Sequence, residues 1–384
     1  MNYNRPNRSD NTITVMVMCF VVSVVFSFLW LYCFQGDVMY VAQHVLSSGK
    51  TQYSNLWGAV VTVLTLWLLQ CGVYALTGLR QRAHALTWFP SMLALAVLTS
   101  VNADIDQRFT FGPWWWLAPL LLILWGWSVV VTRSLQAYGA LSGRGMFSRS
   151  VWTNMLALVA MICMVAVSAN TNAVFHYRTH AEVAMLRGDY GEALRAGARS
   201  LETDSSLMMI RMYALSRQHQ LGERLFAYPV VASSDAMLPT TPSVRLQVYP
   251  PDSVYRLLGA IPRHAMQPMD YIDAIIRHGQ AKPAAADYLL CGYLLDRRLD
   301  DFASAIGRFY VVSDTLPRHY REALVLYTHK RSKPVIVYHD AVLDVDYADY
   351  QEQTSRYKLS SERRGKIMER YANSYWYYYD YVGR

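Results

Sequence analysis

Apolar residues form long, nearly uninterrupted runs over the first 175 residues, whereas later apolar residues recur at helical spacing. A helix needs about 20 mostly apolar residues to cross the hydrocarbon core of a bilayer. The third run is the shortest and contains Pro90, which a membrane helix can accommodate. Residues 1–175 are therefore expected to form a transmembrane region of about five helices, near residues 13–34, 57–76, 85–101, 113–131 and 151–169.

The basic residues between these runs predict an orientation. Connections on the cytoplasmic side of a membrane carry an excess of Lys and Arg. The first and third connections hold only Lys50 and Arg108. The excess lies in the N-terminal tail (Arg5, Arg8), the second connection (Arg80, Arg82) and the fourth (Arg133, Arg144, Arg149). With five spans, the N-terminus is expected to be cytoplasmic and the chain after Phe175 extracytoplasmic.

The five runs contain no Asp, Glu, Lys, Arg or His. Transport driven by ions or protons generally needs such groups at membrane depth, so this class of function is disfavoured. Gln70 and Asn154 are the main polar side chains in the runs, and we expect them to form hydrogen bonds between helices.

Residues 176–384 read as a helical-repeat domain. The segment LRGDYGEALRAGARSLETDSSL (186–207) places Gly188, Tyr190 and Ala193 at the Gly-x-Tyr-x-x-Ala spacing of a tetratricopeptide repeat. In such a repeat the Gly ends one helix, the Tyr fills the gap between paired helices, and the small Ala lets them approach. The fold class predicted is therefore all-α, with a degenerate tetratricopeptide-like array following the membrane helices. Stacked arrays of this kind leave an extended concave face.

Further helices are expected from apolar spacing at 209–226, 284–310 and from Pro317 onward. A Pro- and Ser-rich stretch, 228–251, is expected to be a long loop. The C-terminal stretch 366–381 contains neither Pro nor Gly and is rich in Tyr. We expect it to form one aromatic helix that closes the last repeat, or alternatively an aromatic surface for a membrane or a partner.

Three stretches of this region, ERLFAYP (223–229), ADYLLCGYLLDRRL (286–299) and HYREALVLYTHKRSKPVIVYHDAVLDVDY (319–347), resemble an uncharacterised family of multi-pass membrane proteins from Bacteroidota, a domain of unknown function. The resemblance implies the same architecture and an inner-membrane location. It implies no activity and no catalytic residues.

Composition adds limits rather than a function. The chain is 53% hydrophobic and 17% charged, against about a quarter in typical soluble proteins, and its net charge is +8. No single run or predicted face collects the Lys and Arg, so a nucleic-acid partner is not predicted. Only Cys291 lies beyond the apolar runs, which excludes a disulfide within the soluble region. We expect neither a metal nor another cofactor.

Four groups of residues contain side chains that could ligate a metal or take part in catalysis. His176 and His180 would share a helix face, but no acidic or Cys partner is near in sequence. His319 and Glu322 could act as base and orienter, although Glu in a first helical turn also simply favours the helix dipole. Asp344, Asp346 and Asp349 lack the Gly and final Glu of a calcium loop and suggest a solvated acidic loop. The predicted topology places the fourth group, Asp37, Asp104 and Asp106, outside the cytoplasm.

Two hypotheses follow. The first is a membrane-anchored scaffold whose helical-repeat surface binds an envelope protein or a peptide. The second is a membrane enzyme acting on lipid-linked or envelope glycans, with Asp37, Asp104 or Asp106 as catalytic residues in outer loops. The second rests on architectural analogy alone. It predicts a pocket lined by these carboxylates.

Overall fold

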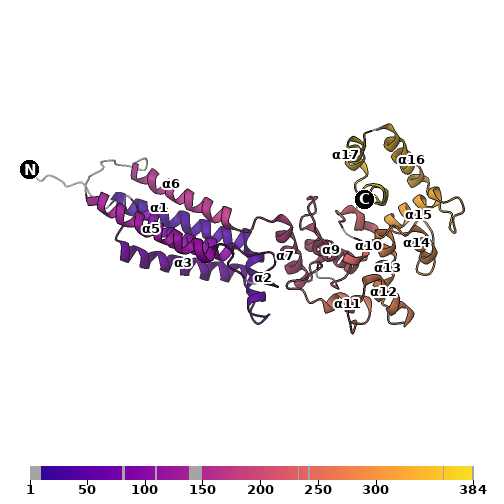
Figure 1. The fold of residues 1–384 in the computed structure, drawn as a ribbon, viewed down its shortest axis with the longest axis horizontal. Helices are drawn as coiled ribbons and strands as arrows, with labels where there is room; N and C mark the ends of the chain where they lie inside the picture. The colour runs from indigo at the N-terminus through magenta and orange to yellow at the C-terminus, as the bar shows by residue number, and fades with distance from the viewer. Residues whose placement is uncertain are drawn as a thin grey trace, which may run out of the picture. The chain divides into compact units, whose positions relative to one another are not determined.

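The computed structural model describes residues 10–79, 83–108, 110–137, 149–231, 233–240, 243–357 and 359–382, and within these ranges every regular element is helical. The chain divides into two compact units, Met1–Asn172 and Ala173–Arg384 (Figure 1). The predicted all-α fold is thus confirmed. Several basic residues used for the predicted orientation lie outside the described residues: Arg5, Arg8, Arg80, Arg82 and Arg144.

The first unit is a bundle of apolar helices. Four helical segments, Thr12–Phe34, Asn55–Thr77, Trp114–Ser134 and Arg149–Ser168, are long and apolar enough to cross a membrane. The protein is therefore expected in association with a membrane. Its elements are α1 (Asp10–Leu29), the π-helical η1 (Trp30–Phe34), α2 (Gly36–Leu46), α3 (Asn55–Thr77), the 3₁₀ turn η2 (His84–Trp88), α4 (Phe89–Thr99), α5 (Trp114–Ala137) and α6 (Arg149–Ser168).

The third expected span, near 85–101, differs in length from the other four. It is a shorter apolar helix, His84–Thr99, that starts as the 3₁₀ turn η2 and continues as α4. Pro90 explains the late start, because proline lacks the N–H of a helix interior and suits a first turn. Leu95 and Ala96 of α4 are fully buried. Irregular backbone at membrane depth is tolerated where protein rather than lipid surrounds it.

Although α4 is short, the described residues of this unit pass five times along the bundle, with His84–Thr99 as the third pass. The N–H of Ala85 donates to Asn154 Oδ1 (2.7 Å) near the start of α6, and Asn170 Nδ2 donates to the carbonyl of Val101 (2.8 Å) beyond its end. The segment from η2 through α4 therefore runs parallel to α6 and covers nearly the same length.

Polar contacts place the other passes. Trp30 Nε1 donates to Thr99 Oγ1, so the end of the first pass lies beside the end of α4. Gln70 Nε2 donates to Thr87 Oγ1 (3.0 Å), which makes α3 antiparallel to the third pass. Together with the Ala85 bond to Asn154, this contact confirms that Gln70 and Asn154 form hydrogen bonds between helices.

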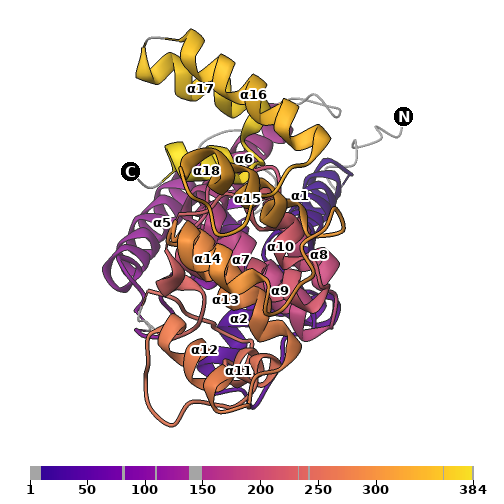
Figure 2. The same ribbon diagram turned by 90° about the vertical axis from the view of Figure 1, so that its right-hand side faces the viewer.

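The second unit is a succession of short helices around one apolar core. Its elements are α7 (Ala173–Leu186), α8 (Tyr190–Arg195), α9 (Ser205–Arg217), α10 (Leu221–Arg224), η3 (Leu225–Ala227), η4 (Ser234–Ala236), α11 (Asp252–Leu258), α12 (Pro268–Arg277), α13 (Pro283–Leu295), α14 (Leu299–Ile306), α15 (Arg318–Lys330), α16 (Ala341–Arg356), α17 (Ser360–Tyr371) and α18 (Tyr375–Tyr381). In both views α16 and α17 form a hairpin at the edge of the unit (Figures 1 and 2).

Local sequence signals set many of these boundaries. Asp189, Asp204 and Asp340 occupy N-cap positions, where each carboxylate accepts backbone N–H groups of the first turn. Pro268 and Pro283 each begin a helix, as the fixed φ of proline favours. The predicted helix pair in 284–310 corresponds to α13 and α14, and the helix expected from Pro317 corresponds to α15.

The predicted repeat residues lie at the turn between α7 and α8. Gly188 has a φ of +76°, a conformation that glycine adopts without strain. Ala193 is buried, and the ring of Tyr190 meets Tyr213 of α9 edge-on at 6.1 Å. The second helix ends after six residues, so the pair is shorter than the pattern suggests. The tetratricopeptide-like character of the array stays a prediction.

The acidic stretch 344–349 and the aromatic stretch 366–381 differ from the predicted secondary structure. Asp344, Asp346 and Asp349 lie within the helix α16 rather than in an acidic loop, because Asp340 caps that helix. The single C-terminal helix expected over 366–381 is two helices, α17 and α18, separated by residues 372–374. Ser374 caps the second by accepting the N–H of Tyr377 at 3.3 Å.

Candidate functional site

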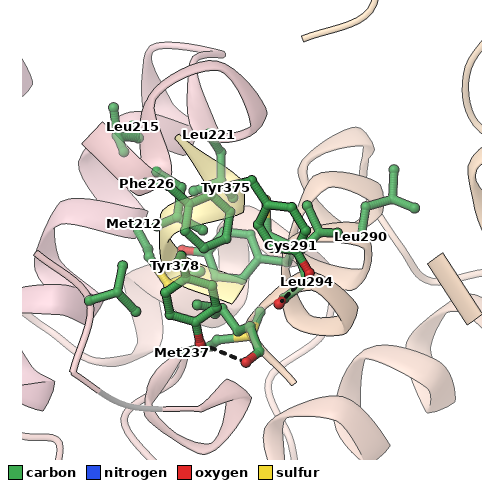
Figure 3. Packing of buried hydrophobic residues seen from close by; sticks show 14 of the residues in the cluster. Met212, Leu215, Leu221, Phe226, Met237, Leu290, Cys291, Leu294, Tyr375 and Tyr378 are labelled. Atoms are coloured by element: carbon green, nitrogen blue, oxygen red, sulfur yellow. Dashed lines mark hydrogen bonds between the residues drawn. The ribbon is translucent and has the colours of Figure 1, made fainter. Parts of the chain in front are cut away.

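The C-terminal helix α18 lies inside the second unit, where it packs on α15 and α17 as well as on helices earlier in the chain. Its side chains fill the space between α9 and α10 on one side and α13 on the other, as Figure 3 shows for Tyr375 and Tyr378. The rings of both tyrosines contact Phe226, with centroids 5.0 and 4.8 Å away. Tyr375, Trp376, Tyr377 and Tyr378 are all buried. We call this space the aromatic groove.

Hydrogen bonds fix α18 in the aromatic groove. The hydroxyl of Tyr375 donates to the carbonyl of Leu294 (3.2 Å), and that of Tyr378 donates to Leu295 (2.7 Å). These carbonyls belong to the last turn of α13, where helical carbonyls have no partner within the helix. The aromatic side chains therefore supply both apolar contact and hydrogen-bond donors to the carbonyls of this last turn.

Arg297 holds the far end of α18. Its guanidinium lies 5.3 Å from the centre of the Tyr378 ring, a cation–π contact, and donates to the carbonyl of Val382. Arg297 itself has a φ of +57°, in the left-handed region that side chains disfavour. Cations near a helix C-terminus stabilise its partial negative charge.

Glu322 joins α15 to the start of α18. Its Oε2 accepts the N–H of Tyr375 (2.7 Å) and Nδ1 of His319 (3.0 Å), while Oε1 accepts Nε of Arg318 (2.8 Å). Its backbone carbonyl accepts Nε1 of Trp376 (2.8 Å). Burial alone favours the neutral carboxyl, but the hydrogen bond from His319 and the nearby charges outweigh it and hold the pKa of Glu322 below its usual range.

His319 is oriented by two partners from opposite sides. Its Nε2 accepts the backbone N–H of Phe226 at 3.2 Å, so Nδ1 carries the hydrogen that is donated to Glu322. Both side chains are buried. Spacing predicted that His319 and Glu322 meet, and they do. Their partners tie η3, α15 and α18 together, which is a packing role rather than the exposed helix-dipole role.

A small polar cavity of about 170 Å³ opens beside Glu322. Arg318 and Arg370 line it together with Asp346 and Asn373. Arg370 forms an ion pair with Asp349 (2.9 Å), and Arg318 is engaged by Glu322. Arg318, Glu322 and Arg370 at this cavity are thus already paired within the chain itself.

Glu182 is a second buried carboxylate, which the sequence pattern did not single out. Its Oε2 accepts three successive backbone N–H groups, those of Gln247, Val248 and Tyr249, at 2.8, 2.8 and 3.1 Å. Burial raises the pKa of Glu182 despite these bonds. The contact anchors the end of the predicted 228–251 loop, which the structure describes except at residues 232, 241 and 242. The signal in the sequence for a buried role of Glu182 was its position within an apolar helical run.

The candidate catalytic carboxylates lie in the first unit. Asp37 is half-buried at the start of α2, and Asp104 and Asp106 are exposed in the turn between α4 and α5. An apolar cavity of about 840 Å³ lies next to that turn, but its walls include none of the three. Within the described ranges, no three His, Cys, Asp or Glu residues are placed to hold a metal ion.

Of the other two candidate histidines, His176 and His180, the second contacts a glutamate. His180 Nε2 lies 3.3 Å from Glu192 Oε1, within hydrogen-bond distance across α7 and α8. This pairing, together with the hydrogen bond from Arg195, holds the pKa of Glu192 below its usual range, with the Arg195 bond the larger cause. His180 thus serves the contact between the two helices of the predicted repeat.

Comparison with known proteins identifies part of the second unit. Residues 262–382 match a family of unknown function (DUF6057). The match covers α12 to α18, including Glu322 and the helix in the aromatic groove, but neither the first unit nor the predicted repeat at α7 and α8. No curated protein and no solved structure matches the chain.

Proposed function

We propose that the protein is a membrane-anchored interaction protein of the inner membrane, whose helical second unit binds an envelope protein or a peptide on the extracytoplasmic side. We take the shorter helix His84–Thr99 as a fifth crossing beside the four long ones, because it runs parallel to α6 over nearly the same length. An odd number of crossings then separates the N-terminus from residue 172. The basic residues of the N-terminal tail and of the second and fourth connections support it as well.

The aromatic groove changes where a partner would bind. A helical array ordinarily offers its inner face to a peptide. Here Tyr375 and Tyr378 of α18 fill the aromatic groove, and hydrogen bonds hold the helix at both ends. The chain thus supplies its own groove ligand, and a partner is expected on an outer surface.

The observation that carries the proposal is a set of exposed valines beside this core. Val335 and Val337 precede α16, and Val342 and Val345 lie three residues apart on it, one helical turn that puts them on the same face. Their exposed fractions are 63–75%, whereas Leu343 and Tyr347 of the same helix are buried. Exposed patches of apolar side chains often mark protein–protein interaction sites.

Site-specific photocrosslinking in native membranes tests the proposal. A benzophenone side chain at Val342 or Val345 is expected to give one discrete adduct. The matched control is Leu201, which is equally exposed (69%) but lies between α8 and α9. The same adduct from Leu201, or none from either valine, would contradict the proposal. A Val342→Asp/Val345→Asp variant should no longer bind the crosslinked partner, while its thermal unfolding stays unchanged.

A further inference from the structure

The connection between α15 and α16 ends in an extended stretch on the surface. Val335 and Val337 are exposed, whereas Ile336 is half-buried and Tyr338 is buried. This alternation is typical of an extended chain with one covered face. Asp340, at the end of the connection, has a φ of −134° and a ψ of 121°, which are also values of an extended chain. We call residues 337–340 the edge segment.

The inner side of the edge segment is attached to α15. The N–H of Tyr338 donates to Thr328 Oγ1 at 3.2 Å, and the carbonyl oxygen of Tyr338 lies 3.4 Å from the same hydroxyl oxygen. In an extended chain the backbone groups of successive residues point to opposite sides. The N–H and C=O groups of Val337 and His339 therefore point away from α15.

These outward backbone groups are available to another chain. In the part of the chain that the structure describes, neither the N–H nor the C=O of Val337 or His339 forms a hydrogen bond. An unpaired edge of this kind is a template for a strand from a second molecule. Because Val337 and His339 are two residues apart, each can exchange a pair of hydrogen bonds with an antiparallel strand, the more stable of the two pairings.

The side chains around the edge segment favour an apolar strand. Val337 is 63% exposed, and Val335 before it and Val342 and Val345 of α16 are 68–75% exposed. Side chains on the same face of two paired strands contact one another. Apolar residues at alternate positions of an added strand would therefore cover valines that the protein itself leaves in water.

Charge gives the added strand an acidic end. Lys333 is exposed, and among the described residues it forms no ion pair. Its neighbour Arg331 already pairs with Asp300 at 2.6 Å. At the other end, His339 already contacts Asp344 at 3.1 Å. The available cation therefore lies before the edge segment, where a carboxylate of the partner would be complementary.

We propose that the edge segment binds an extended stretch of the partner protein as an added antiparallel strand, with apolar residues at alternate positions and an acidic residue opposite Lys333. This inference rests on the proposed function, because it uses the surface around Val342 and Val345. It names the conformation of the partner segment and the backbone groups, those of Val337 and His339, that bind it.

A proline substitution separates backbone pairing from apolar contact. The full-length protein carries a benzophenone side chain at Val345 in native membranes, and the adduct yield is measured. Val337→Pro keeps an apolar side chain but removes the N–H, and should lower the yield about fivefold. Val337→Ala keeps the N–H and should lower it less than about twofold. The matched control is Leu201→Pro, at an exposed residue whose N–H also has no partner among the described residues, and its yield should be unchanged.

Hydrogen exchange keeps the test decisive if proline disturbs the connection. In the purified adduct of the protein with natural Val337, the amides of Val337 and His339 should exchange about tenfold more slowly than in the free protein. The charge is tested separately. Lys333→Glu should lower the adduct yield about threefold, whereas Lys366→Glu, at an exposed lysine of α17, should not.

The outcomes distinguish this inference from the proposed function. A yield that falls equally in Val337→Ala and Val337→Pro, or unchanged exchange in the adduct, would show that a helix or another apolar surface binds there, and only strand pairing would be overturned. An unchanged yield in Lys333→Glu would overturn the acidic residue. An adduct of two copies of this chain would replace the partner by self-pairing. No adduct from Val345 would contradict both proposals.

Discussion

Replacing Glu322 with Gln should release α18 from the aromatic groove more often. The carboxylate accepts three donors, from Arg318, His319 and Tyr375, through two oxygens. A Gln has one acceptor oxygen, so its NH₂ group must face a donor. The least costly arrangement turns the NH₂ toward Arg318, whose side chain is half-exposed and can turn to water.

The magnitude follows from these contacts. A hydrogen bond to a charged group contributes about 1.5–3 kcal/mol and a neutral one about 0.5–1.5 kcal/mol. Losing the Arg318 bond and weakening the other two costs about 3 kcal/mol on this scale. Removing a buried charge returns about 1 kcal/mol. The net loss of about 2 kcal/mol corresponds to a roughly thirtyfold increase in the opening equilibrium.

Hydrogen exchange of the full-length protein measures this opening directly. Peptides covering residues 375–382 should exchange roughly thirtyfold faster in Glu322→Gln, while α1 to α6 serve as an internal reference. The matched control is Glu369→Gln, at an exposed glutamate of α17 that pairs with Lys366. If the two variants exchange equally over 375–382, Glu322 does not anchor α18 and the reasoning fails.

Three other outcomes are expected. Folding lowers the pKa of Glu322, so its contribution to stability is fully present above the ordinary glutamate pKa of about 4.3. This contribution is lost as the pH falls through the lower folded value. Protection of residues 375–382 against hydrogen exchange should therefore decline at acidic pH in the natural protein but not in Glu322→Gln. Tyr378→Phe should lower the free energy of α18 opening by about 1 kcal/mol through loss of the bond to α13, measured by the same exchange, whereas Tyr379→Phe should change little. Glu182→Ala should leave three N–H groups of residues 247–249 without an acceptor and make the chain there sensitive to limited proteolysis, and an unchanged cleavage pattern would refute that anchoring role.

Sequence spacing predicted the parts of the fold that depend on neighbours along the chain. The helix starts at Pro283 and after Pro317 follow from local preferences, as does the meeting of His319 and Glu322 three residues apart. Hydropathy did not predict that the third pass begins as the 3₁₀ turn η2 before it continues as the helix α4.

The aromatic groove could not be predicted in this way. Its contacts join residues far apart, such as Phe226 with Tyr375 and Leu295 with Tyr378. Residues 372–374 contain no Pro or Gly, so the sequence does not signal the break between α17 and α18. The break places the four aromatic residues that follow in buried positions. Glu182 likewise meets its partners about 65 residues away, which no local pattern encodes.

Reporter fusions test the central claim, that five passes display the helical unit outside the cytoplasm. Fusions of alkaline phosphatase after Arg82, Asp106 and Phe175 each report one side of the membrane. The account predicts an inactive fusion at Arg82 and active fusions at Asp106 and Phe175. Activity at Arg82 with none at Phe175 would contradict it, and an inactive fusion at Asp106 would show that the short helix α4 does not complete a crossing.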